Sequence, residues 1–141
     1  MVWLKSKGED VNVKANDGSI PMFDAASSGQ IKVMHWLKEQ GVDIHAKDND
    51  GCSFMYTAAL SGQIEAMRWL KEQGADINVK DNDGRTPMFA AAFGGHIEVL
   101  VWLKSQGSDV NARAYNESTP IVFAQAFGHD EAVAWLRENA S

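Results

Sequence analysis

Residues 82–114 read NDGRTPMFAAAFGGHIEVLVWLKSQGSDVNARA and combine turn signals with two short apolar segments. The pair Asp83-Gly84 predicts a hairpin tip, because these residues tolerate the positive φ angles that a tight turn requires. Thr86 and Pro87 then predict the start of a helix, since threonine can cap free amides and proline suits the first helical position. The alanine-rich residues 88–93 predict a helix of about two turns that ends at the following glycines.

The second half of this stretch predicts another helix over residues 96–106. Apolar side chains recur at helical spacing from Ile97 to Leu103, while Glu98 and Lys104 are expected to face water. Gly107 suits the position just past a helix C-terminus. Residues 108–111 then lead into the next hairpin, so the unit is turn, helix, turn, helix and extended loop.

The same pattern returns every 33 residues. A tryptophan followed by leucine marks the period five times, at Trp3, Trp36, Trp69, Trp102 and Trp135. A fixed period of this size indicates stacked units, so function is expected on a surface rather than in a catalytic pocket. We predict that the tryptophans belong to the core, where burial contributes roughly 2–3 kcal/mol per side chain.

The composition excludes several classes of protein. The net charge of −6 over 141 residues argues against non-specific nucleic-acid binding, which needs a clustered basic surface. Cys52 is the only cysteine, so neither an internal disulfide nor a cysteine-rich zinc site is possible. There is no run of 18 or more apolar residues and no signal-peptide pattern at the start. We therefore expect an intracellular protein with no membrane or nucleic-acid partner.

Three sets of motifs resemble the ankyrin repeat family. The Thr-Pro-Leu-His-x-Ala signature is matched by TPMFAA at 86–91 and more loosely at 20–25, 53–58 and 119–124. Gly-His-x-Glu recurs at 95–98 and 128–131, and Gly-Ala-Asp-x-Asn is intact at 74–78. The resemblance covers essentially the whole chain and implies an all-α repeat solenoid with hairpin loops, without catalytic residues, metal or cofactor.

The motifs divide the chain into one array, residues 1–141. Residues 1–15 match only the tail of a repeat, which leaves two alternatives: a longer array cut at this point, or a degenerate N-terminal cap. Full repeats are expected at 16–48, 49–81 and 82–114. The more polar residues 115–141 are expected to form a C-terminal capping repeat whose second helix covers 130–139.

Two departures from the family pattern have local consequences. The usual histidine is replaced by Phe23, Tyr56, Phe89 and Val122, so apolar packing should replace the usual Thr–His hydrogen bonds. Ile20 stands where a capping threonine belongs, which predicts a cost of about 1 kcal/mol.

The residues that could bind a metal or act as a nucleophile or acid are better explained by structural roles. His96 and His129 share a repeat position, so their expected spacing of about 8–10 Å is too long for one zinc ion. Cys52 is expected at the surface without a histidine base nearby. Asp43, Asp76 and Asp109 recur in one loop phase, as turn-forming residues do.

In the ankyrin family the hairpin tips and the first helices bind other proteins, so the informative residues here are those that differ between repeats. A basic row runs along an otherwise acidic chain and predicts an acidic partner segment: Lys14, Lys47, Lys80 and Arg113. Apolar and arginine side chains that vary between repeats complete a candidate patch: Leu60, Arg85, Phe93, Arg113, Tyr115 and Phe127. The alternative is that Leu60, Phe93 and Phe127 pack between helices.

The resemblance implies a monomeric, non-catalytic protein-interaction module that binds a partner protein on its concave face. The alternative is a regulatory or targeting segment of a larger enzyme, channel or secreted effector. The resemblance also implies possible asparagine hydroxylation at Asn12, Asn78 and Asn111.

Overall fold

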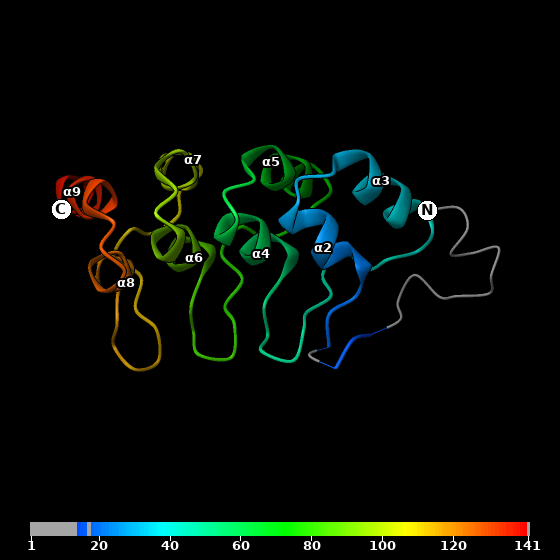
Figure 1. The fold of residues 1–141 in the computed structure, drawn as a ribbon, viewed down its shortest axis with the longest axis horizontal. Helices are drawn as coiled ribbons and strands as arrows, with labels where there is room; N and C mark the ends of the chain where they lie inside the picture. The colour runs from blue at the N-terminus through cyan, green and yellow to red at the C-terminus, as the bar shows by residue number, and fades with distance from the viewer. Residues whose placement is uncertain (1–13, 17, 141) are drawn as a thin grey trace.

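The computed structural model describes residues 14–16 and 18–140, which form eight helices in four antiparallel pairs. The first helices of the pairs make an inner row: α2 (Pro21–Ser27), α4 (Phe54–Leu60), α6 (Pro87–Gly94) and α8 (Pro120–Ala126). The second helices make an outer row: α3 (Ile31–Glu39), α5 (Ile64–Glu72), α7 (Ile97–Ser105) and α9 (Asp130–Asn139). Hairpin loops project from the inner row on the side away from the outer row (Figure 1). The all-α repeat solenoid is confirmed, and none of the described helices is long and apolar enough to cross a membrane.

The core lies between the two rows, and it differs from the prediction in one respect. Only Trp102 is nearly enclosed, at 9% exposed, while Trp36, Trp69 and Trp135 are half-buried at the edge of the core. The leucine after each tryptophan is fully enclosed instead: Leu37, Leu70, Leu103 and Leu136. Neighbouring helical residues point about 100° apart, so only one of each pair can face the inner row. The prediction that the tryptophans are core residues was therefore wrong for these three, and Trp3 lies outside the described residues.

The starts of the inner helices also correct the capping prediction. Among the eight described helices, only α4 has a side-chain N-cap, in which Ser53 Oγ accepts the backbone N–H of Tyr56 at 3.1 Å. Thr86 makes no such bond, so its predicted capping role was wrong. Because α6 begins with Pro87, it has no N–H at its first position, and the same holds for α2 after Ile20. Ile20 therefore does not make the start of α2 less stable than the start of α6, in contrast to the capping cost that the sequence predicts.

The hairpin tips are joined to one another by hydrogen bonds. Asn82 donates its backbone N–H to Asp50 O and its side-chain Nδ2 to Asn49 O, both at 2.9 Å. In the next hairpin Tyr115 replaces this asparagine, and its backbone N–H still bonds Asp83 O at 2.9 Å. The tips therefore form a continuous edge along the array, although each repeat is a separate unit in the sequence.

Glu117 is the one non-glycine residue with positive φ in the described part of the chain. Its φ is 72°, and the equivalent positions in the three preceding hairpins are glycines. A side chain in this conformation costs about 1–2 kcal/mol. Replacing Glu117 with glycine is therefore expected to stabilise the protein by about 1 kcal/mol and raise its Tm by about 3 °C, measured by thermal unfolding.

The same replacement removes an exposed ion pair between Glu117 and Arg113, 3.0 Å long. Pairs of this kind contribute little, so Glu117→Gln, which keeps the Cβ atom, is expected to change the stability by less than about 0.5 kcal/mol. A fall in Tm for Glu117→Gly would show that the backbone conformation is not strained.

Candidate binding surface

An apolar ridge runs across the C-terminal ends of three successive inner helices. Its members are Leu60, Phe93 and Phe127, with 37%, 42% and 52% of each side chain exposed. The rings of Phe93 and Phe127 are in contact, with their centroids 4.2 Å apart. These side chains are not tucked between helices, as the alternative interpretation required. Phe93 and Phe127 form one contiguous exposed surface, with Leu60 at the equivalent end of the preceding inner helix, and exposed apolar side chains gathered in this way usually mark a contact site.

The apolar ridge shares a helix face with residues that touch the hairpins. Phe123 on α8 precedes Phe127, the C-cap residue of that helix, by four positions, and Tyr56 precedes Leu60 by four on α4, so each pair lies on one face. The Arg85 guanidinium, carried by a hairpin, lies 4.9 Å from the centroid of the Phe123 ring. One surface therefore continues from the hairpin bearing Arg85 to the apolar ridge.

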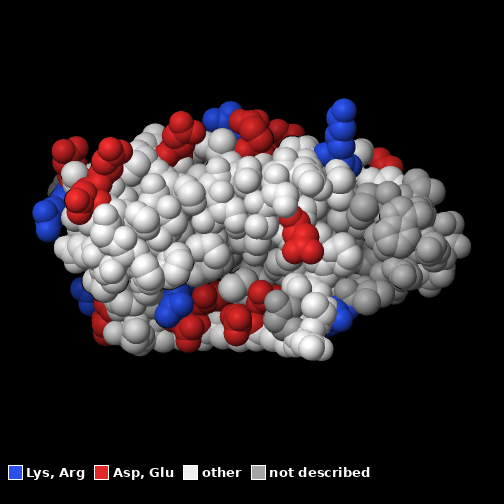
Figure 2. Space-filling view, viewed as in Figure 1, with Lys and Arg blue, Asp and Glu red and all other residues white. Residues whose placement is uncertain are grey.

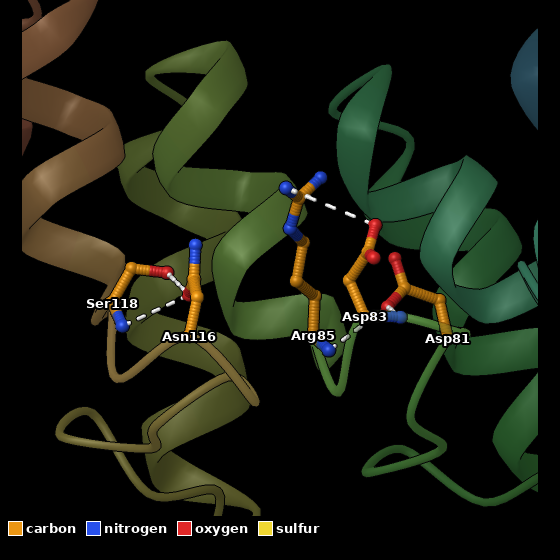
Figure 3. A network of polar contacts seen from close by, with 5 residues as sticks. All are labelled: Asp81, Asp83, Arg85, Asn116 and Ser118. Atoms are coloured by element: carbon orange, nitrogen blue, oxygen red, sulfur yellow. Dashed lines mark hydrogen bonds and ion pairs between the residues drawn. The ribbon is translucent and has the colours of Figure 1, made fainter.

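Arg85 is held in a network of polar contacts (Figure 3). Its backbone N–H bonds Asp81 Oδ1 at 2.9 Å, and its guanidinium lies 3.9 Å from the carboxylate of Asp83. In the next hairpin the backbone N–H and the hydroxyl of Ser118 both bond Asn116 Oδ1, at 3.1 and 2.6 Å. The side chain of Arg85 is thus fixed by stacking and by a neighbouring charge, and it is one-third exposed.

The structure divides the residues of the predicted patch between separate hollows. Arg85 and Tyr115 line a cavity of about 310 Å³, beside the Phe123 face. Lys80 and Arg113 line a different cavity of about 320 Å³, together with residues from the loop that follows α7. Lys47 lines a third hollow, of about 110 Å³. The basic row is therefore not part of the hollow that adjoins the Phe123 face.

The hairpin side of the surface is electrostatically negative. Burial, followed by the carboxylates of Asp48, Asp81 and Asp50, raises the pKa of the Cys52 thiol to about 12, although Arg85 acts in the opposite direction. Burial, followed by Asp81, likewise raises the pKa of the Tyr56 hydroxyl to about 12. Arg85 therefore does not cancel the field of the carboxylates around it.

Burial and the neighbouring carboxylates together predict that Cys52 is a poor nucleophile. A thiol with a pKa of about 12 is almost wholly protonated at pH 7, and only the thiolate reacts. The folded protein is expected to react with iodoacetamide at least about tenfold more slowly than the same protein unfolded in urea. The two rates should converge as the pH rises toward 12. Equal rates at pH 7.5 would contradict the raised pKa.

The recurring aspartates and histidines have structural partners. Asp43, Asp76 and Asp109 each accept the backbone N–H two residues later, at 2.8–3.0 Å, which confirms them as turn-forming residues. Nε2 of His96 and of His129 lies 2.9 Å from a carbonyl oxygen of the preceding repeat's inner helix. Within residues 14–16 and 18–140, no group of three or more side chains is arranged to hold a metal ion.

The asparagines that the resemblance implied as modification sites are only partly within the described chain. Asn78 and Asn111 are exposed, and each makes a side-chain hydrogen bond, to Ser108 and to the carbonyl of Ala140 respectively. Asn12 lies outside the described residues. Hydroxylation stays a prediction.

Two features of this surface were missed from the sequence. Asp50 and Asp83 carry exposed carboxylates on the two central hairpins, where the flanking repeat has Asn116. Val122, on α8, is 46% exposed next to Phe123. The signal for these carboxylates was present in the sequence, since the position of Asn116 is an aspartate in each of the three preceding repeats.

Paired helices in two rows, with a hairpin edge on one side, define a helical-repeat protein. A family model for ankyrin repeats (three copies) matches residues 1–81 and 58–141. The chain belongs to the ankyrin repeat family. A search of curated proteins found no match.

Proposed function

We propose that this chain is a non-catalytic interaction module, which binds a partner protein through the apolar ridge and the adjoining hairpins. Ankyrin repeat domains generally mediate protein–protein interaction and are typically non-catalytic. The observation that carries the proposal for this chain is the apolar ridge itself. Three large side chains of successive repeats stay exposed, whereas α6, which carries Phe93, buries its other apolar residues almost completely.

The exposure of the ridge has an energetic meaning. An apolar side chain moved from water into a contact contributes about 25 cal/mol for each Å² buried. Phe93 and Phe127 already touch, so a partner would cover them together and would lose little in ordering two rigid rings. Arg85 and Tyr115 add the residue types that are enriched at the centres of interfaces.

The proposal is tested with a random peptide library displayed on phage and selected on the purified chain. Phe93→Ser combined with Phe127→Ser is expected to weaken binding of the selected peptides at least about tenfold. The matched control is Val101→Ser on α7, because Val101 is 46% exposed but lies on the outer row. Peptides that bind the double variant unchanged, or that depend on Val101, would overturn the proposal.

A further inference from the structure

We infer that the partner segment is basic as well as apolar: an apolar side chain covers the apolar ridge, and a lysine or arginine meets Asp50 and Asp83. This inference rests on the proposed function and adds the chemistry of the partner. The sequence alone predicted an acidic partner from the basic row.

The first step is the sign of the charge next to the ridge. Asp50 is exposed and makes no ion pair with any described residue, and the Asp83 side chain is 69% exposed. The guanidinium of Arg85 lies 3.9 Å from the carboxylate of Asp83. Asp48 and Asp81 stand behind these two carboxylates and already accept backbone N–H groups. The two hairpins carry these four carboxylates and three cations, Lys47, Lys80 and Arg85, so the balance of charge there favours a cation.

The second step is the position of the basic row. Arg113 is paired with Glu117, and Lys47 Nζ lies 3.5 Å from the carbonyl of Lys80, along the array. None of these three side chains lines the hollow formed by Asp83, Arg85 and Tyr115. Figure 2 shows acidic side chains, with some basic ones among and beside them, along the lower edge, beneath a broad surface over the helices that is mostly uncharged. Charge complementarity therefore favours a basic partner at the edge of an apolar contact.

The third step is the distance between the two contacts. The hairpin bearing Asp83 leads into α6, and Phe93 lies near the end of this helix of eight residues, which is about 12 Å long. An extended peptide covers about 12 Å with four residues. The partner segment should therefore carry a basic residue about four or more positions from a large apolar one.

The test uses the phage selection with a library of equal acidic and basic content. Peptides that depend on Phe93 are expected to be enriched in lysine and arginine at this spacing. Asp50→Asn combined with Asp83→Asn should weaken their binding about tenfold, and binding should also weaken as salt rises. The matched control is Lys47→Gln combined with Lys80→Gln, which changes the same two hairpins with the opposite sign and should not weaken binding.

The outcomes separate the two proposals. The inference of a basic partner is wrong if the selected peptides depend on Phe93 but are acidic. It is also wrong if replacing the lysine pair, and not the aspartate pair, weakens binding. In both cases the proposed interaction surface stands. If binding depends on neither Phe93 nor the aspartates, both proposals fail. Thermal unfolding of each variant shows that the loss of binding is not a loss of folding.

Discussion

Leu70→Ala is expected to lower the free energy of unfolding by about 3 kcal/mol. Leu70 lies on α5 with no exposed surface, between the inner and outer rows at the centre of the array. The replacement removes buried apolar atoms and leaves a cavity that packed neighbours fill only in part. Urea unfolding followed by tryptophan fluorescence measures the loss.

The control for this prediction is Val101→Ala, also on an outer-row helix. Val101 is 46% exposed, so the loss there is expected to be below about 0.5 kcal/mol. Trp69→Ala should cost less per atom removed than Leu70→Ala, since Trp69 is only half-buried. A larger loss of unfolding free energy per atom for Trp69→Ala would show that the tryptophans, and not the leucines, form the centre of the core.

The period of the sequence was enough to predict the architecture. Glycine and proline positions placed the two helices of residues 82–114 within about two residues of α6 and α7, and the helix predicted over 130–139 coincides with α9. These boundaries are local, because they depend on residues that the backbone tolerates at turns and helix starts. Local rules therefore predict them from the sequence alone.

The predictions that were wrong concern details that depend on neighbouring repeats. Whether Trp69 or Leu70 faces inward depends on how α5 is rotated about its own axis. Packing against the inner row sets this rotation. The capping of α4 by Ser53, but not of α6 by Thr86, follows from side-chain orientation in the assembled stack. Likewise, the separation of Arg85 from Arg113 could be seen only when the hairpins were placed side by side. Leu60, Phe93 and Phe127 are exposed, and their role in binding stays a prediction, whereas the contact between Phe93 and Phe127 joins two repeats and could not be read from one.

Gly51→Ala is expected to destabilise the protein by about 3 kcal/mol, because it combines backbone strain with a clash between hairpins. Gly51 has a φ of 80°, and a Cβ atom there would lie 2.8 Å from the backbone nitrogen of Asn82. That nitrogen donates to Asp50 O, so the added methyl group would push apart the two hairpins that this bond joins.

Gly74→Ala separates the two contributions. Gly74 also has a positive φ, 96°, but nothing lies within 4 Å of the position of its Cβ atom. Only the backbone strain applies there, so the expected loss is about 1 kcal/mol. The difference between the two variants, measured by urea unfolding, then reports the close approach of the hairpins. Because the repeats are stabilised through their interfaces, Gly51→Ala should also broaden the unfolding transition, whereas Gly74→Ala should leave its slope unchanged. Equal losses for both variants would mean that the hairpins move apart without cost, and that the edge they form is not a rigid part of the binding surface.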